Sequence, residues 1–423
     1  MWTNKILDKA LGNSFGQHLV GGYRFLITHY RPQCKIYIFG FSRGAYTARF
    51  LNEMLDYVGL VGPEHGELIP FLWEAFATWK LSHSCESAKR AVAYHFLRIC
   101  RETVCYPICR VHFLGLFDTV NSIAEFQVDT ETRPGARFIR HAVGIDERRV
   151  NFQPVLVLPG TVSNHHRSPH SPDPPTVQSA VSQRPELNNI ALTDNTDEEA
   201  TQDLLEVWFP GDHTDIGGGW KLGKGEQCPL SHTPLVWMAR EAQRAGLRFD
   251  HARFKEAKCC GCENLSEDCL PVIRPISPVE VEGESEQSES RSFFNCLRLS
   301  STKGLLHGRL RFGNGLSSIS VLSWRFIEYL PFGRMHLQCD GSWKLIHWPL
   351  PRGAWRDIPA NALIHGSAID RMNSDPNYRP ENLNVRSDRR GMGRAPKENG
   401  IGTWVCAGKE DDPVRQVWRR GEQ

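Results

Sequence analysis

The feature that most constrains the fold is the pentapeptide Gly-Phe-Ser-Arg-Gly at residues 40–44, which separates two regular patterns. Residues 36–39 before it are β-branched and aromatic, as in a parallel strand covered on both faces. After it, apolar side chains recur at helical spacing. The pattern predicts a central strand, a tight turn that exposes the Ser42 hydroxyl, and a helix, with Gly40 and Gly44 allowing strand and helix to approach closely.

The surrounding chain continues this alternation of helix and strand. An amphipathic helical pattern covers residues 14–30, before the first strand. Apolar runs at 111–117 and 204–209 predict two more buried strands, and helical patterns cover 88–100 and 234–245. This order is typical of a doubly wound α/β fold with a mostly parallel sheet.

Two polar residues at predicted strand ends suggest partners for Ser42. Asp118 directly follows the strand at 111–117, and His213 follows the strand at 204–209. Parallel strands end at the same sheet edge, so both residues should lie beside the serine turn. A serine hydroxyl needs a histidine to take its proton and a carboxylate to orient that histidine. The order serine, acid, histidine indicates an α/β-hydrolase-like fold with Ser42, Asp118 and His213 as the catalytic residues.

Other residues compete for these roles. Asp118 could simply cap the element after its strand, and Asp215 is the alternative acid, beside Asp212 and Asp146. Asp212, His213 and Asp215 could instead hold a metal ion, which would make the protein a metal-dependent hydrolase. The charged run at 146–149 is more typical of a solvated or paired charge cluster than of a site.

The cysteines do not indicate a metal site. There are 13 of them, an odd number, and no secretory signal precedes them, which favours free thiols over a disulfide framework. Four lie close together at spacings that match no common zinc motif: Cys259, Cys260, Cys262 and Cys269. The serine chemistry requires neither a metal nor an organic cofactor.

Charge and hydropathy exclude several classes of protein. The net charge is +2, from 50 basic and 48 acidic residues, so no overall field would attract nucleic acid. No apolar stretch approaches the roughly 18 residues of a transmembrane helix, and the N-terminus lacks the apolar core of a secretory signal. We expect an intracellular, cytoplasmic protein that contacts a membrane surface only transiently, although no basic amphipathic helix is evident.

Two segments interrupt the α/β pattern. Residues 161–200, rich in Pro, Ser, Asn and Asp, predict a disordered insertion. Residues 251–320, with a glutamate- and serine-rich centre, predict a second segment of low order. The catalytic domain would then span residues 15–250, and residues 321–423 would pack on it or complete it. Order should resume in one apolar cluster: Trp324, Phe326, Ile327, Tyr329 and Leu330.

Longer motifs resemble one known family. They surround Ser42, Asp118 and His213, and further matches extend toward the C-terminus: residues 38–49, 117–120, 141–142, 145–149, 207–219, 237–238, 357–359, 364–367 and 378–383. Over about residues 15–385 the chain resembles the phospholipase effectors of bacterial type VI secretion, and within them the fungal branch. The resemblance implies the same three catalytic residues and, from the bacterial relatives, cleavage of phospholipid acyl esters.

The resemblance also has a departure. Family members begin with a strand that ends in Asp-Gly-Thr, and nothing in residues 1–13 resembles it, which implies a domain truncated at its N-terminus. One oxyanion donor, the backbone N–H of Arg43, is retained, whereas the second usually comes from the region before it. We therefore expect a serine esterase or lipase that cleaves carboxylic, phospholipid-like ester bonds. A catalytically inactive interaction module is the alternative, and the oligomeric state is left open.

Overall fold

The computed structural model describes most of the chain: residues 2–81, 87–106, 108, 110–120, 135–157, 202–223, 225–260, 284–313, 316–330, 333–338, 343–346, 352–383, 401–408 and 412–421. The insertion expected at 161–200 lies outside these residues, as do Cys262 and Cys269.

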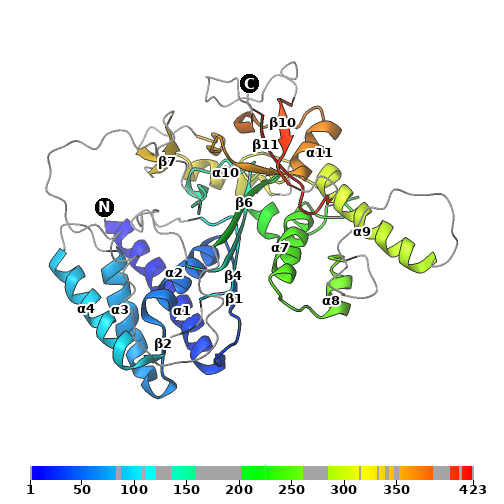
Figure 1. Ribbon diagram of the computed structural model, residues 1–423. Coiled ribbons are helices and arrows are strands. Elements are labelled where there is room, and N and C mark those ends of the chain that lie inside the picture. The colour runs from blue at the N-terminus through cyan, green and yellow to red at the C-terminus, as the bar shows by residue number, and fades with distance from the viewer. Residues whose placement is uncertain are drawn as a thin grey trace.

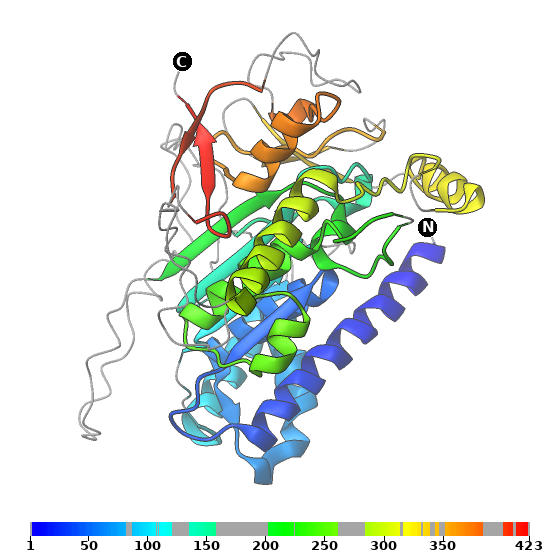
Figure 2. The ribbon, with the colours of Figure 1, turned by 90° about the vertical axis from the view of Figure 1, so that its right-hand side faces the viewer.

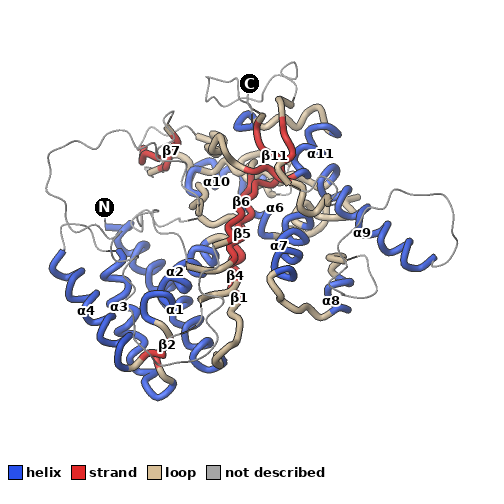
Figure 3. Tube along the Cα trace, in the orientation of Figure 1, coloured by secondary structure: helices blue, strands red, loops and turns tan. Residues whose placement is uncertain are grey.

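A seven-stranded sheet runs through the middle of the molecule (Figure 3), in the order β1-β4-β5-β6-β9-β11-β10. Its first five strands are parallel, and β11 pairs antiparallel with both β9 and β10. The strands are β1 (Tyr37–Phe41), β4 (Phe113–Phe117), β5 (Phe138–Gly144), β6 (Asp203–Phe209), β9 (Leu363–His365), β10 (Trp404–Cys406) and β11 (Val417–Arg420). A mostly parallel sheet between helices confirms the predicted α/β-hydrolase-like class.

Helices cover both faces of this sheet (Figure 1). On one face lie α1 (Trp2–His29), α2 (Arg43–Val58), α3 (Ile69–Leu81) and α4 (Ser87–Thr103). On the other lie α6 (His213–Gly217), α7 (His232–Arg244), α8 (His251–Glu256) and α9 (Glu284–Lys303). In the described part of the chain, no helix combines the length and apolarity that a membrane crossing requires.

The remaining elements are short or belong to the C-terminal third. Two helices, α10 (Ser318–Ile327) and α11 (Gly366–Ser374), belong to this third, and Figure 2 shows α11 beside the hairpin of β10 and β11. Two small sheets pair β2 (Leu60–Val61) with β3 (Cys105–Tyr106) and β7 (Arg334–Leu337) with β8 (Trp343–Ile346). The 3-10 helices are η1 (Pro63–Leu68), η3 (Val150–Phe152) and η4 (Glu381–Leu383).

The position of β1 differs from the prediction. Its extent and the helix that follows agree with the pattern, but β1 pairs with β4 alone among the described strands and therefore lies at the sheet edge rather than at the centre. Phe39 in this strand is 45% exposed. An apolar run indicates that helices cover the faces of a strand. It does not indicate whether the strand has one neighbouring strand or two.

Strand β5 was missed because its sequence contains charged residues. Arg140 and His141 break the apolar run, yet both are buried between β4 and β6. The Arg140 guanidinium lies 2.6 Å from a Glu241 carboxylate oxygen, and His141 Nδ1 lies 2.9 Å from Glu206 Oε2. A buried charge is tolerated when it is paired and hydrogen-bonded, so a central strand can carry one.

The expectation of low order over 251–320 is wrong for α8, α9 and the start of α10. Helix α9 packs against α7 and α11, and it buries Phe293 and Leu297 in the core beside α7. The first turns of α9 contain glutamates and serines, which are typical of disordered segments, whereas its second half has apolar residues at helical spacing.

The cysteines and the aromatic residues of α10 also differ from expectation. A disulfide joins Cys228 to Cys296 in α9, where free thiols were expected, and Cys259 is among the six free cysteines of the described residues.

The residues expected to form one apolar cluster after residue 321 do not pack together. Trp324 contacts Phe152, whereas Phe326, Tyr329 and Leu330 are exposed.

Shortening a buried side chain of α9 should destabilise the fold if this helix belongs to the core. We predict that Leu297→Ala lowers the free energy of unfolding by about 3 kcal/mol, because it leaves a cavity. Asn295→Ala, at an exposed position of the same helix, should change it by less than about 0.5 kcal/mol. Urea denaturation measures both, and equal effects would show that α9 does not contribute to the core.

Candidate active site

Ser42 occupies a strained turn between β1 and α2. Its backbone has φ 62° and ψ −128°, a conformation that is uncommon for any residue other than glycine. A Cβ on Gly40 would lie 2.5 Å from Ala45 Cα and from Gly44 O, so the close approach of strand and helix requires glycine there. A Cβ on Gly44 would meet no atom within 4 Å. The packing role predicted for both glycines therefore applies to Gly40 and not to Gly44.

The sheet register places the candidate residues side by side. Phe41 pairs with Phe117, so Ser42 and Asp118 are the next residues of two adjacent parallel strands. The Ser42 N–H donates to Phe117 O (3.0 Å), and the Asp118 N–H donates to Ala142 O (2.7 Å). His213 begins α6, shortly after β6 ends.

The three side chains form one continuous hydrogen-bonded chain. His213 Nε2 lies 2.8 Å from Ser42 Oγ, and His213 Nδ1 lies 2.6 Å from Asp118 Oδ2. Because an ionised carboxylate can only accept, Nδ1 carries the proton toward Asp118. Nε2 is then free to accept from the Ser42 hydroxyl. This is the arrangement in which a histidine can act as a base toward serine.

The Asp118 carboxylate is fully buried and has four donors. Oδ1 accepts from Gly144 N–H (2.8 Å) and from Arg356 Nη1 (2.6 Å), while Oδ2 accepts from Arg356 Nη2 (2.8 Å) and His213. Burial by itself raises the pKa of Asp118, but the Arg356 guanidinium and the hydrogen bond from His213 outweigh it. The pKa of Asp118 is therefore held well below its usual range, and this carboxyl stays ionised.

Arg356 was not found by sequence reasoning. It comes from the loop before β9, is almost fully buried, and also donates to Gly144 O (2.8 Å) and Phe152 O. The signal that could have found it is its position directly before the motif at 357–359. An arginine more than two hundred residues from the aspartate gives no periodic pattern to follow.

Aromatic rings hold the histidine between them. The His213 ring centroid lies 4.6 Å from that of Phe41 and 4.9 Å from that of Phe152. Phe152 is covered in turn by the Arg149 guanidinium, 3.4 Å from its centroid, and Arg149 pairs with Glu147 at 2.7 Å. The run 146–149 thus contains a buried, paired charge cluster, and it supports the ring beside His213.

A second histidine fixes the segment after Asp118. His141 in β5 accepts from the Thr119 N–H through Nε2 (3.1 Å) and binds Glu206 through Nδ1 (2.9 Å). All three side chains are buried. Because both ring nitrogens are engaged, the turn that carries Asp118 is held against the neighbouring strand.

The alternative acids have other partners. Asp215 Oδ1 lies 2.6 Å from His307 Nδ1, and Asp212 caps α6 by accepting from backbone N–H groups. Asp146 accepts from Gly211 N–H and the Tyr378 hydroxyl. The metal site considered for Asp212, His213 and Asp215 is not assembled, since His213 binds Asp118 and Asp215 binds His307. Across the described ranges no three His, Cys, Asp or Glu side chains are grouped to hold a metal ion.

The two glycines of the turn provide a matched pair of substitutions. Gly40→Ala should lower the free energy of unfolding by about 3 kcal/mol, because its Cβ would overlap backbone atoms of α2. Gly44→Ala should be neutral or stabilise by about 0.5 kcal/mol, since it adds helix propensity in open space. Urea denaturation compares them, and a similar loss in both would contradict the packing described for Gly40.

Removing the Arg356 charge should make stability depend on pH in the opposite sense to the wild type. In the wild type the depressed pKa of Asp118 stabilises the fold above the pKa of the unfolded chain, and this is lost only in strong acid. In Arg356→Met, burial should raise that pKa, so stability should fall as pH rises toward neutrality. The expected loss at neutral pH is about 3–5 kcal/mol.

Adding Asp118→Asn to Arg356→Met provides the control. The double variant has no carboxylate at position 118, so it should recover part of the loss and show little of the new pH dependence. Denaturation curves at pH 5 and pH 7.5 distinguish the cases. An unchanged pH profile in Arg356→Met would show that Arg356 does not set the ionisation of Asp118.

Comparisons with known proteins complete the description of the site. The uncharacterized protein YEL023C of Saccharomyces cerevisiae is 23% identical over 89% of this chain and 70% of the yeast protein, in agreement with the fungal branch. No solved structure matches the chain. The family model described as "T6SS, Phospholipase effector Tle1-like, catalytic domain" matches residues 1–241, more than half of the chain. Membership of a phospholipase family suggests hydrolysis of lipid esters. The chain belongs to the family of Tle1-like phospholipase effectors of type VI secretion.

Proposed function

We propose that this protein is a serine hydrolase that cleaves acyl ester bonds of lipids, with Ser42 as nucleophile, His213 as general base and Asp118 as the acid that orients the histidine. The observation that carries the proposal is the hydrogen-bonded chain from Ser42 Oγ through both nitrogens of His213 to Asp118. The strained serine turn at the carboxyl end of β1 supports it. The phospholipase family supports the choice of substrate class.

The reaction would proceed through an acyl-enzyme. His213 Nε2 takes the Ser42 proton as Oγ attacks the ester carbonyl carbon, and a tetrahedral intermediate forms. Its collapse breaks the ester bond, and the protonated His213 gives its proton to the departing alkoxide. Water, deprotonated by the same histidine, then attacks the acyl-Ser42 ester, and the fatty acid leaves as His213 returns the proton to Ser42 Oγ. No cofactor takes part in these steps.

Charge that develops on the carbonyl oxygen requires hydrogen-bond donors. Arg43 is the first residue of α2, so its backbone N–H belongs to the first turn, whose N–H groups lack an intrahelical acceptor. We assign this N–H as one oxyanion donor, next to Ser42. The positive end of the α2 dipole adds to the stabilisation.

Arg356 is a positioning residue in this mechanism. It does not reach Ser42 or His213; instead it keeps Asp118 ionised and holds both carboxylate oxygens in fixed directions. Asp118 therefore stabilises the His213 imidazolium without taking its proton.

Covalent labelling tests the proposal directly. The wild-type chain should react with a fluorophosphonate at Ser42, detected as an adduct by intact-mass measurement and peptide mapping. Ser42→Ala should not react, whereas Gly44→Ala should still react because its new Cβ lies in open space. A folded wild-type chain that does not label would contradict the serine mechanism and leave the inactive interaction module as the interpretation.

The choice of acid can be tested separately. Asp118→Asn should lower kcat for a short-chain ester by about 10⁴-fold, because the histidine would adopt the wrong tautomer. Asp215→Asn should retain most of the activity, since Asp215 binds His307 and not His213. Circular dichroism confirms that each variant is folded, and a larger loss in Asp215→Asn would reverse the assignment.

A further inference from the structure

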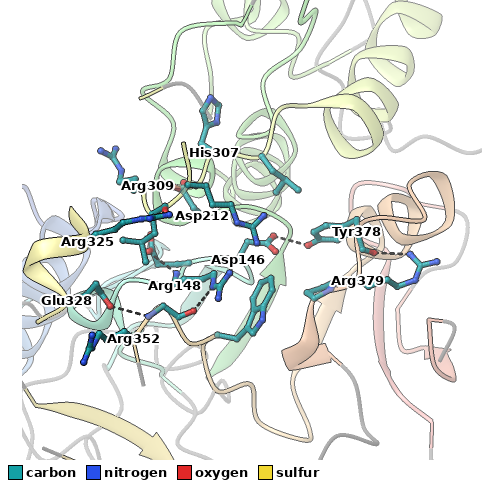
Figure 4. Close-up of a pocket in the computed structure, with 18 of the residues that line it drawn as sticks. Asp146, Arg148, Asp212, His307, Arg309, Arg325, Glu328, Arg352, Tyr378 and Arg379 are labelled. Atoms are coloured by element: carbon teal, nitrogen blue, oxygen red, sulfur yellow. Dashed lines mark hydrogen bonds between the residues drawn. The ribbon is translucent and has the colours of Figure 1, made fainter. Parts of the chain in front are cut away.

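A cavity of about 480 Å³ borders the segment that carries His213. Figure 4 shows residues that line this cavity. Asp212, the neighbour of His213, lines it, and Arg309 on its wall donates to Thr214 Oγ1 (2.9 Å) on the other side of His213 in sequence. Neither Ser42 nor Asp118 lines this cavity. It is therefore a separate space that borders the segment carrying the histidine.

Six arginines line the cavity: Arg148, Arg309, Arg311, Arg325, Arg352 and Arg379. Figure 4 shows Arg148, Arg309, Arg325 and Arg352 gathered around it. Within the described part of the chain, no ion pair joins any of the six to a carboxylate. Some buried arginines elsewhere are paired, such as Arg140 with Glu241 and Arg356 with Asp118, both at 2.6 Å. The cavity thus collects six cations that form no direct ion pair within the described residues.

The partners of these arginines are neutral groups. Arg148 and Arg325 donate to backbone carbonyls, and Arg309 donates to a hydroxyl. The Nε of Arg309 is buried without an acceptor. Such an arrangement leaves guanidinium donors available to an anion.

Five carboxylates also line the cavity, one fewer than the arginines: Asp146, Glu147, Asp212, Glu328 and Asp375. Glu147 is neutralised by its pair with Arg149, which lies outside the cavity wall. Burial raises the pKa of Asp146 and of Glu328, and burial together with neighbouring carboxylates raises that of Asp212. Burial and the nearby charge of Arg311 lower the pKa of Arg148, as expected where cations crowd together.

The aromatic rings of the cavity argue against a cationic ligand. Trp355 and Tyr329 line it, and each ring already has a guanidinium over its face: Arg148 at 5.0 Å and Arg352 at 3.9 Å from the centroids. A quaternary ammonium group needs open aromatic faces for cation–π contact. A choline headgroup would therefore be repelled by the guanidinium groups that cover the two rings.

We propose that this cavity binds the phosphate of an anionic phospholipid, of the phosphatidic acid type, and so selects the headgroup of the lipid whose ester Ser42 cleaves. Guanidinium groups bind phosphate oxygens through paired N–H donors, which suits an unpaired arginine cluster. This inference rests on the proposed lipid hydrolase function for its link to catalysis. The binding site itself rests on the arginines alone.

The helix beside the cavity favours a lipid over a free phosphate. Arg325 of α10 lines the cavity, and the same helix exposes a stripe of apolar side chains at helical spacing: Ile319 (78% exposed), Leu322 (57%) and Phe326 (68%). An apolar helix face next to a phosphate site matches the two parts of a phospholipid, acyl chains and headgroup, at a membrane surface.

Binding is tested in the full chain carrying Ser42→Ala, so that no lipid is consumed. Flotation with phosphatidylcholine vesicles containing phosphatidic acid should show binding, and vesicles in which a fatty acid supplies the negative charge should bind less. Arg309→Gln with Arg311→Gln should weaken binding to phosphatidic acid vesicles by about tenfold or more. Arg24→Gln, which removes an exposed arginine of α1, should leave it unchanged.

Three binding results would overturn the proposal. Equal binding to phosphatidic acid and fatty acid vesicles would show attraction to charge alone. Equal losses in the double variant and in Arg24→Gln would do the same. The third result is that inorganic phosphate binds through the two arginines while the protein shows no preference for vesicles containing phosphatidic acid. Free phosphate would then be the ligand. Arg325→Gln, at the exposed rim, repeats the test if the double variant does not fold.

Hydrolysis distinguishes failure of this inference from failure of the proposed function. In the chain with Ser42 intact, the double variant should lose about tenfold or more in kcat/KM on phosphatidic acid and less than about twofold on p-nitrophenyl butyrate. Equal loss on both esters would contradict headgroup binding. If no ester is cleaved while arginine-dependent binding to phosphatidic acid persists, the hydrolase function fails and the phosphate site stands.

Discussion

The buried ion pair between Asp118 and Arg356 is the interaction on which the candidate site depends. A carboxylate without solvent is tolerated only with a full set of donors, and Arg356 supplies two of four. Because the same guanidinium binds Gly144 O and Phe152 O, it joins the ends of two strands to the ring that packs on His213. Arg356 therefore contributes to both the position and the ionisation of the aspartate, together with Gly144 and His213.

Arginine has two different roles in this molecule. Three interior arginines are paired, with Glu241, Glu147 and Asp118, and they organise strand ends and aromatic rings. Around the cavity arginine contacts carbonyls, a hydroxyl and ring faces and keeps its charge. The paired arginines fix structure, whereas the six around the cavity together favour binding of an anion. The candidate catalytic residues and the arginine-lined cavity thus both lie near the carboxyl ends of the parallel strands.

Much of the fold could be predicted because it follows local rules. The strand, turn and helix around Ser42 lie within about twenty residues, and the strands before Asp118 and His213 are short apolar runs bounded by polar residues. Where charge interrupted the pattern, prediction failed: β5 carries Arg140 and His141, and α9 begins with glutamates and serines. In both cases distant partners, such as Glu241 for Arg140, make burial possible, and no local window contains them.

The sequence by itself determined the order of helices and strands, the residue types at the strand ends and the resemblance to a family, because periodicity and motifs are local properties of the chain. Only the tertiary structure decided that β1 lies at the sheet edge, that Asp118 rather than Asp215 meets His213, and that Arg356 holds Asp118. It also gathered six arginines from distant segments around one cavity. The physical reason is that hydrogen bonds, ion pairs and electric fields depend on distance in space, which the linear spacing of residues does not encode.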